Sequence, residues 1–271
     1  MNKTLYISDL DGTLLRGDQT LSRFTIDTLS ELIGRGMIFS YATARSLVTA
    51  SKATAGLMPN IPVVIYNGSF VVESATGKRL LSNAFGAQEA EHILDVILHH
   101  QVYPIVYAFV DGAEKFSYCK AHESRGTKIF NDTRRGDVRD NPVNEIGALY
   151  RGEIFHITCI DEPEKLLPLY DAFKEDYPCV YHRDIYSGEQ WLEIQPGGAT
   201  KAQAILALKQ LLGCDRIVCF GDGKNDISMF EIADECYAVE NADDELKCMA
   251  NATIASNECD GVARWLAEHV F

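Results

Sequence analysis

The sequence predicts an α/β fold with a mostly parallel sheet in a three-layer core, into which a smaller α+β domain is inserted. Three observations support this prediction. Short apolar runs alternate with segments of helical periodicity near both ends of the chain, which is typical of strands joined by helical crossovers. Several apolar runs end in polar or small residues, and the alternation breaks down in the middle of the chain. At 271 residues, the chain is long enough for one large domain or two smaller ones.

The first apolar run ends in two closely spaced aspartates. Residues 4–8 read Thr-Leu-Tyr-Ile-Ser, and Asp9 and Asp11 follow with one residue between them, before Gly12 and Thr13. Ligands of parallel α/β sheets bind at the carboxyl ends of the strands, where Asp9 would lie. Two carboxylates this close repel each other unless a cation lies between them or a proton is shared. We therefore expect a cation here, and Mg²⁺ is the natural partner of carboxylate, carbonyl and water oxygens.

Two further strands, expected at residues 37–42 and 63–66, also end in polar or small residues. These residues are Thr43, Ala44 and Arg45 after the earlier strand, and Asn67 and Gly68 after the later one. Helical crossovers between such strands are right-handed and make the strands parallel. We therefore expect Asp9, Thr43 and Asn67 to share one edge of the sheet.

The middle of the chain, residues 84–190, has a different order of strand-like and helical segments. Short strand-like runs and helical stripes occur with few long crossovers, which indicates an α+β domain with a mostly antiparallel sheet. Strands are expected at 105–110, 115–120, 154–160 and 180–183, and helices near 87–97 and 166–173. The polar stretch 122–144 is expected to form a loop or poorly ordered helices. We therefore divide the chain into a first core segment (1–83), an inserted cap domain (84–190) and a second core segment (191–271).

The second core segment opens with a helix that begins near Thr200. Thr200 fits an N-cap, and Gln203 follows at the spacing of a capping box. Lys201 would lie in the first turn, where a cation is unfavourable for the helix dipole. The position of Lys201 therefore suggests a function other than helix stability.

A strand at 216–220 ends in the most polar turn of this segment. Residues 221–226 read Gly-Asp-Gly-Lys-Asn-Asp, which would place Asp222, Asn225 and Asp226 at the end of the strand. Two further short strands and a final helix complete the segment, and Asp260-Gly261-Val262 opens that helix. The turn therefore adds two carboxylates to the expected edge of the sheet.

The overall composition argues against some partners. The formal net charge is −14 and the sequence pI is about 4.9, which disfavours nucleic acid or an anionic membrane surface as the main partner. An anionic substrate would need local positive charge. The chain shows no signal segment and no apolar run long enough to span a bilayer, and its eight cysteines lack Cys-x-x-Cys spacing. We expect a cytoplasmic protein with reduced cysteines, bound to neither nucleic acid nor membrane.

Four motifs occur in the order used by the haloacid dehalogenase (HAD) superfamily. They are Asp-Leu-Asp-Gly-Thr at 9–13, Thr43 at a strand end, Lys201 at a helix start and Gly-Asp-Gly-Lys-Asn-Asp at 221–226. With Asn67-Gly68 and Asp260-Gly261-Val262, the pattern resembles the Cof-type, class IIB sugar-phosphate phosphatases, which carry C2-type caps. The resemblance covers essentially the whole chain and implies a Rossmann-like core. Ala44 and Ala202 stand where relatives often have glycine, and these small-for-small changes leave the expected chemistry intact.

The resemblance implies a phosphatase that works through an aspartyl-phosphate. Asp9 would be the nucleophile and Asp11 the general acid and base, as phosphoryl transfer requires. The expected Mg²⁺ ligands are Asp9, Asp222 and the backbone carbonyl of Asp11. Lys201 and Thr43 would complete the catalytic group, with Asp226 as a supporting residue that orients Lys201 or a metal-bound water. The expected phosphate-binding residues are Leu10, Gly12, Thr43, Ala44, Arg45, Asn67, Lys201 and Asn225.

Each residue also has an ordinary structural interpretation. Thr43 can be a strand-end threonine, Lys201 and Arg45 surface cations, and Asp226 a favourable charge at a helix start. A two-component receiver domain also groups acids, Thr and Lys around Mg²⁺, but it lacks the Asp-x-Asp-Gly-Thr sequence and is far shorter. A non-enzymatic relative would be expected to lack Asp9 or Asp11, and both are present.

The resemblance makes a small phosphorylated metabolite the expected substrate, sugar phosphates before others. Nucleotides and cofactor phosphates such as pyridoxal phosphate or flavin mononucleotide remain open, as does a phosphomutase of the same fold. Cap residues would set this choice, but solvated surface is the first interpretation for the candidates, which are His122, Arg125, Tyr181, Arg183 and Tyr186. The sequence does not indicate an oligomeric state.

Overall fold

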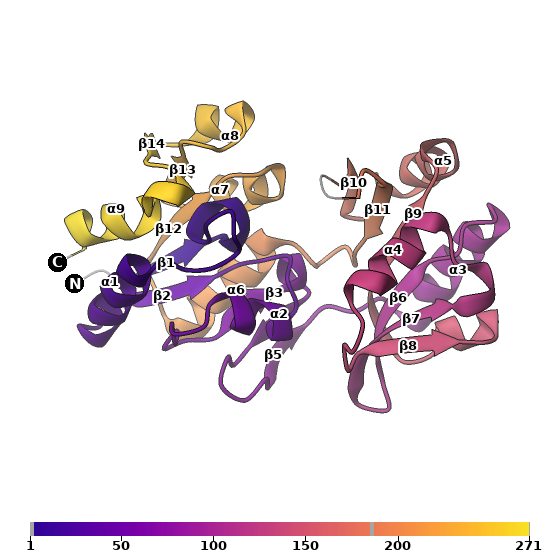
Figure 1. Ribbon diagram of the computed structural model, residues 1–271. Helices are drawn as coiled ribbons and strands as arrows, with labels where there is room; N and C mark the ends of the chain where they lie inside the picture. Colours follow the sequence, from indigo (N-terminus) through magenta and orange to yellow (C-terminus); the bar gives the residue numbers. More distant parts are fainter. Residues whose placement is uncertain (1–2, 185–186, 271) are drawn as a thin grey trace. The chain divides into compact units, whose positions relative to one another are not determined.

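The computed structural model describes residues 3–184 and 187–270, and the chain forms two compact units (Figure 1). The first unit combines Met1–Ser82 with Gly198–Phe271, and the second unit is Asn83–Gly197. Across the described residues, no helix is both long and apolar enough to cross a bilayer. The prediction of an α/β fold with a parallel core sheet is confirmed by the arrangement of the first unit.

The first unit is built on a five-stranded parallel sheet in the order β14-β13-β12-β1-β2. Its strands are β1 (Thr4–Ser8), β2 (Ile38–Tyr41), β12 (Arg216–Gly221), β13 (Glu235–Val239) and β14 (Ala252–Ile254). Strand β1 lies between β2 and β12, although more than 200 residues separate β1 from β12 in the sequence (Figure 1). The residues that follow β1 and β12 are therefore neighbours at the carboxyl edge of the sheet.

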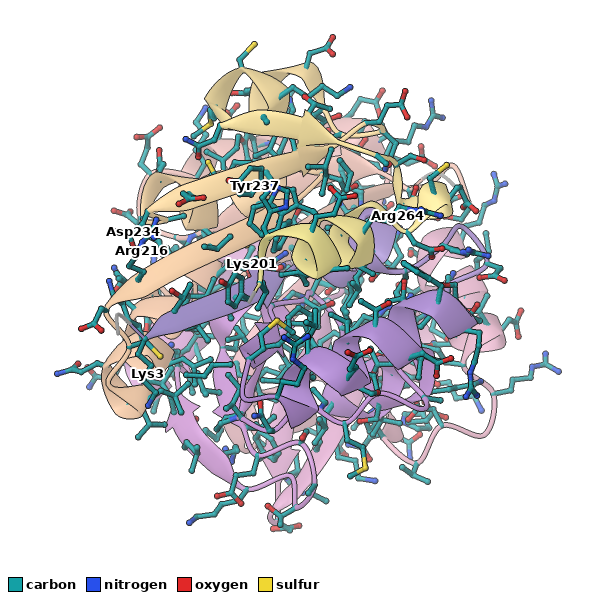
Figure 2. The ribbon with its side chains drawn as sticks, turned by 90° about the vertical axis from the view of Figure 1, so that its left-hand side faces the viewer. Lys3, Lys201, Arg216, Asp234, Tyr237 and Arg264 are labelled. Carbon is teal, nitrogen blue, oxygen red and sulfur yellow. The ribbon has the colours of Figure 1, made fainter. Side chains whose placement is uncertain are left out.

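Helices cover this sheet. They are α1 (Arg23–Gly34), α2 (Leu47–Ala53), α6 (Lys201–Leu212), α7 (Ile227–Glu231), α8 (Asp244–Met249) and α9 (Gly261–His269). Helix α9 packs beside α1, and Trp265 of α9 lies 4.3 Å from Tyr237 and 5.2 Å from Phe220, ring centre to ring centre. Figure 2 shows Tyr237 on the face of the sheet that α9 covers. Helix α6 packs instead against α7 and the strands that follow α2.

The third predicted strand runs parallel to β2, as expected, but it also begins a separate antiparallel sheet. Strand β3 (Val63–Ile65) contacts the parallel sheet through a parallel bridge between Ala42 and Val64, and pairs antiparallel with β4 (Phe70–Val72). Strand β5 (Arg79–Ser82) completes this three-stranded sheet. The cause is the turn Tyr66–Gly68, whose residues have φ of 50°, 51° and 106° and reverse the chain.

The second unit is a six-stranded sheet in the order β10-β11-β9-β6-β7-β8, antiparallel except between β7 and β8. Its strands are β6 (Ile105–Val110), β7 (Ala113–Cys119), β8 (Asp140–Val143), β9 (Glu153–Asp161), β10 (Cys179–Arg183) and β11 (Gln190–Ile194). Strand β11 pairs with both β9 and β10. The expected resumption of the core at residue 191 is therefore wrong, because β11 completes the sheet of the second unit.

Three helices cover the second sheet: α3 (Ala87–His99), α4 (Arg125–Thr133) and α5 (Pro163–Phe173). Helices α3 and α5 share an apolar core that includes Ile93, Ile97, Leu166 and Leu169. Helix α4 and strand β8 lie within residues 122–144, where a loop or poorly ordered helices were expected. Ser124 caps α4 by accepting a hydrogen bond from Thr127 N at 2.9 Å, and the buried Phe130 packs 5.6 Å from Phe116.

Candidate active site

Lys201 lies buried between two carboxylates of the first unit. Its Nζ donates hydrogen bonds to Asp9 Oδ1 at 2.5 Å and to Asp226 Oδ1 at 2.6 Å, and its side chain is only 1% exposed. Thr200 fixes this position because its side chain accepts a hydrogen bond from Gln203 N, which starts α6 at Lys201. The unfavourable position in the helix dipole is thus compensated by two ion pairs, and the surface-lysine interpretation is wrong.

Asp226 organises the turn after β12. Its Oδ2 accepts hydrogen bonds from Asp222 N at 2.9 Å and Gly223 N at 3.1 Å, while Oδ1 accepts the bond from Lys201. Glycine is required at 221, since a Cβ there would lie 2.8 Å from Asp226 Oδ2. Both carboxylate oxygens of Asp226 are therefore engaged in holding the turn and Lys201.

Asp222 is held against the turn that follows β1. Its Oδ1 accepts a hydrogen bond from Thr13 Oγ1 at 2.7 Å. Gly12 permits this approach, because a Cβ at that position would lie 2.2 Å from Asp222 Oδ2, and its φ of 76° also favours glycine. The Gly12 carbonyl accepts a hydrogen bond from Asn241 Nδ2 at 2.7 Å, which fixes the turn from the opposite side.

The carboxylates of Asp9, Asp222 and Asp226 form one cluster, with a ligand atom from each within 4.8 Å of the others. Burial raises the pKa of Asp9 well above its usual range despite the nearby Lys201, and repulsion from Asp226 and Asp222 adds to the effect. Burial also raises the pKa of Asp222 to about 6, against the opposing hydrogen bond from Thr13. The cluster is therefore short of positive charge.

Lys201 alone does not balance these acids. Burial acts to lower the pKa of Lys201, but attraction to Asp226 and Asp9 raises it above its ordinary value. Three charged carboxylates beside one ammonium would leave two negative charges uncompensated, which matches the charge of a divalent cation.

The donor set also fits a hard divalent cation. Within the described part of the chain, Asp9 Oδ2 and Asp222 Oδ2 accept no hydrogen bond, whereas both oxygens of Asp226 do. Free carboxylate oxygens at a strand edge are ligands that Mg²⁺ prefers. Asp9 and Asp222 are thus the residues suited to hold such an ion, and Asp226 supports them through its hydrogen bonds to Lys201 and the turn.

The carboxylate of Asp11 does not belong to this cluster. Arg45 binds it with two nitrogens, Nε to Oδ2 at 2.7 Å and Nη2 to Oδ1 at 2.5 Å. The side chain of Asp11 is half-exposed, and that of Arg45 is 17% exposed. Arg45 is therefore neither a free surface cation nor a second charge beside Asp9, but the partner of Asp11.

Thr43 and Asn67 lie together, as predicted for strand ends on one edge. Asn67 N donates to Thr43 O at 2.9 Å. Thr43 N donates to Val64 O at 3.0 Å, so this amide is engaged and only the Thr43 hydroxyl, which accepts a bond from Arg45 N, is suited to meet a phosphoryl group. Among the described residues, buried Asn67 Oδ1 has no hydrogen-bond partner.

The other predicted phosphate-binding residues differ in their exposure to solvent. The side chain of Leu10 is fully buried, so only its main chain could meet a ligand. Ala44 and Asn225 are exposed, and a Cβ on Gly223 would lie 2.8 Å from Asn225 Oδ1.

Sequence reasoning missed three residues that hold the site. Thr13 binds Asp222, Asn241 binds the Gly12 carbonyl, and Asn257 Nδ2 donates to Leu15 O at 2.9 Å. Thr13 stands inside the first motif and could have been assigned from it. Asn241 and Asn257 carry no local signal, because only the tertiary fold brings them to the turn after β1.

The cap candidates have partners within the second unit. The ring of His122 stacks on Tyr103 at 4.1 Å, Arg125 Nε lies 3.3 Å from Glu189 Oε1, and Tyr181 stacks on Tyr170 at 5.2 Å. Arg183 Nε donates to Gly188 O at 2.7 Å. Tyr186 lies outside the described residues.

Comparison with known proteins finds a matching family and similar phosphatases. A family model described as haloacid dehalogenase-like hydrolase matches residues 6–266. The chain is 28% identical over 276 residues to the 5-amino-6-(5-phospho-D-ribitylamino)uracil phosphatase YitU of Bacillus subtilis, covering 96% of this chain and 95% of that protein. It is 24% identical to the pyridoxal phosphate phosphatase YbhA of Escherichia coli, covering 97% of each.

The fold is shared with solved structures. The crystal structure of TM0651 from Thermotoga maritima superposes with a TM-score of 0.79 at 24% sequence identity. The match covers 100% of this chain and 98% of that one. At this level of identity the likeness establishes the fold and leaves the chemistry to the site residues.

Proposed function

The chain belongs to the haloacid dehalogenase-like hydrolases, as a phosphatase of the Cof type, and we propose that it hydrolyses small phosphomonoesters with Mg²⁺ through an aspartyl-phosphate intermediate. The observation that carries the proposal is the buried group of Asp9, Asp222, Asp226 and Lys201. Its two uncompensated negative charges and the open oxygens of Asp9 and Asp222 suit a divalent cation. A cation held there offsets the charge of the incoming phosphoryl group.

Asp9 is proposed as the nucleophile. One of its oxygens forms a bond to phosphorus while the bond from phosphorus to the leaving oxygen breaks, and Asp11 gives a proton to that oxygen. A water then attacks the phosphoaspartate and Asp11 accepts its proton, which restores Asp9 and releases inorganic phosphate. Lys201 keeps Asp9 in position through the 2.5 Å bond to Oδ1. The Thr43 hydroxyl and the side-chain amide of Asn67 are proposed to bind the phosphoryl oxygens.

Sugar phosphates and polyol phosphates are the proposed substrate class. The resemblance to class IIB sugar-phosphate phosphatases supports this choice, and the phosphate of the YitU substrate is borne on a ribityl chain. Pyridoxal phosphate, the substrate named for YbhA, is a second candidate substrate to be assayed. We also propose a cytoplasmic location, since all eight cysteines are free thiols, as is typical of a reducing compartment.

The proposal is tested by phosphate release from p-nitrophenyl phosphate with Mg²⁺, with EDTA and after Asp9→Asn. We expect activity that requires the metal and is lost in the variant, together with a phosphoenzyme that forms only when Asp9 is present. Activity that persists in EDTA, or in Asp9→Asn, would refute the mechanism. A panel of ribose 5-phosphate, ribitol 5-phosphate, pyridoxal phosphate and nucleotides then ranks the leaving groups, and an isomerised sugar phosphate in place of free phosphate would identify a mutase.

A further inference from the structure

A tight turn between β1 and α1 presents Gln19 to the site. Arg16 N donates to Thr20 O at 3.0 Å, and Gln19 N donates to Arg16 O at 2.8 Å. Asp18 Oδ1 braces the turn by accepting from Thr20 N at 3.0 Å and Thr20 Oγ1 at 2.7 Å. Gln19 has a φ of 63°, a left-handed conformation that residues other than glycine seldom adopt. The turn therefore holds Gln19 in a backbone conformation that costs energy, which calls for a compensating role.

The turn is anchored to the segment before the last helix. Arg16 Nη2 donates to Asp260 Oδ2 at 2.9 Å, and Gly17 N donates to Glu258 Oε1 at 2.6 Å. Asp260 is 9% exposed and also accepts a bond from Thr25 Oγ1 at 3.2 Å. Asp260 belongs to the Asp-Gly-Val motif noted in the sequence, to which the proposed chemistry assigns no function.

The side chain of Gln19 contacts Arg45, the partner of Asp11. Its Oε1 accepts a hydrogen bond from Arg45 Nη2 at 2.9 Å, and the same nitrogen donates to Asp11 Oδ1 at 2.5 Å. Arg45 Nε donates to the other oxygen of Asp11 at 2.7 Å. One guanidinium nitrogen therefore bridges Gln19 and Asp11, and the contacts form a continuous chain from Asp260 to Asp11.

We propose that Gln19 is a positioning residue, which holds Arg45 and through it the carboxyl group of Asp11, and that Asp260 fixes Gln19 through Arg16. The inference rests on the proposed function, in which Asp11 must both donate and accept a proton. Arg45 Nη2 lies between Gln19 Oε1 and Asp11 Oδ1, so the bond to Gln19 fixes the guanidinium independently of its contacts with Asp11. The carboxyl group of Asp11 therefore keeps the same position during both steps.

The test compares two substrates of similar shape but different leaving groups. Phenyl phosphate needs a proton on its leaving oxygen, whereas p-nitrophenolate is a stable anion and departs without one. If Gln19 positions Asp11, Gln19→Gly should lower kcat/KM about 10-fold for phenyl phosphate and less than about 2-fold for p-nitrophenyl phosphate, since misplaced catalytic groups lose rates of this order. Asp260→Asn tolerates the left-handed backbone of Asp260 (φ 57°) and should change the same ratio in the same direction, by about 3-fold.

Glycine is the informative substitution because it accepts the left-handed backbone of the turn and removes only the side chain. The matched control is Gln101→Gly, since Gln101 is exposed, also has a positive φ, of 57°, and lies in the second unit after α3. We expect the control to keep both kcat/KM values, and Gln19→Gly and Gln101→Gly to unfold within about 2 °C of the wild type. Equal loss on both substrates, or no loss on either, would overturn the inference while leaving the phosphatase proposal intact. A wild-type protein that hydrolyses neither substrate would instead refute the proposed function, and this inference with it.

Discussion

Replacing Lys201 by methionine tests whether the site is built on charge compensation. The methionine fills a similar volume but leaves Asp9 and Asp226 facing each other without the ammonium that now lies 2.5 and 2.6 Å from their oxygens. All three side chains are at most 6% exposed, so water cannot solvate the remaining charges in place of Lys201. Removing one partner of a buried ion pair costs about 3–5 kcal/mol. Because this ammonium serves two carboxylates, we expect the upper part of that range.

This loss of unfolding free energy corresponds to a large decrease in the melting temperature. At 2–4 °C per kcal/mol for a domain of 150–250 residues, a cost of about 4–5 kcal/mol in Lys201→Met should lower the melting temperature of the first unit by roughly 8–20 °C. Mg²⁺ should offset part of the loss, since the variant leaves one more negative charge beside the open oxygens of Asp9 and Asp222. Phosphatase activity should fall to background, because Asp9 loses the contact that holds it in place.

The assay is thermal unfolding followed by circular dichroism at pH 7.5, in EDTA and in excess Mg²⁺. Lys209→Met is the matched control, since Lys209 lies on the same helix with its side chain 27% exposed and its Nζ 3.9 Å from Asp234 Oδ2. Exposed or half-exposed pairs of this kind contribute at most about 1 kcal/mol. If the two variants unfold within about 2 °C of each other in EDTA, the reasoning about the buried cluster is refuted.

Three further predictions follow from the same structure. Asp222→Asn should stabilise the metal-free protein at pH 7.5 by about 1–3 kcal/mol, because burial raises the pKa of Asp222 to about 6 and the variant removes the cost of ionising it. The same variant should abolish the rise in melting temperature on adding Mg²⁺, and an unchanged Mg²⁺ response would contradict this prediction. Burial raises the pKa of Glu193 from 4.5 to about 7, so the folded state holds more protons than the unfolded state in this interval and loses stability as pH rises through it. Glu193→Gln should therefore exceed the wild type in stability by about 1–3 kcal/mol at pH 8, allowing for partial exposure, with no difference near pH 4 in denaturant titrations. Gly68→Ala should cost at least about 2 kcal/mol, because its Cβ would lie 2.1 Å from Thr200 O, whereas Gly112→Ala, also at positive φ but with open space around it, should cost clearly less in the same titration.

Local patterns predicted most of the elements because each has a local cause. Ser22 and Thr200 cap helices through their side chains, and the apolar runs at both ends of the chain form the parallel sheet. The errors arose where a distant partner decided the structure. Strand β11 reads as a core strand but finds its partners in β9 and β10, and no local signal distinguishes the two outcomes.

The site shows the same division between local and distant causes. The turn after β12 is determined locally, since glycine at 221 makes room for Asp226 five residues later in the same motif. The pair of Asp11 with Arg45 joins two strand ends, and its geometry depends on side-chain choices that motif spacing does not encode. Sequence reasoning therefore named the clustered acids and paired Asp226 with Lys201, as the structure has it, but it did not assign Arg45 to Asp11.

The topology explains why the chemistry and the second unit can vary separately. Strand β1 lies between β2 and β12, so the two aspartate-bearing turns meet whatever the length of chain between them. The second unit leaves the first after β5 and returns before α6, and none of its strands enters the parallel sheet. Within residues 3–184 and 187–270, the hydrogen bonds that hold Asp9, Asp222 and Lys201 come from the first unit. Substitutions in the second unit should therefore leave in place the group that receives the phosphoryl moiety.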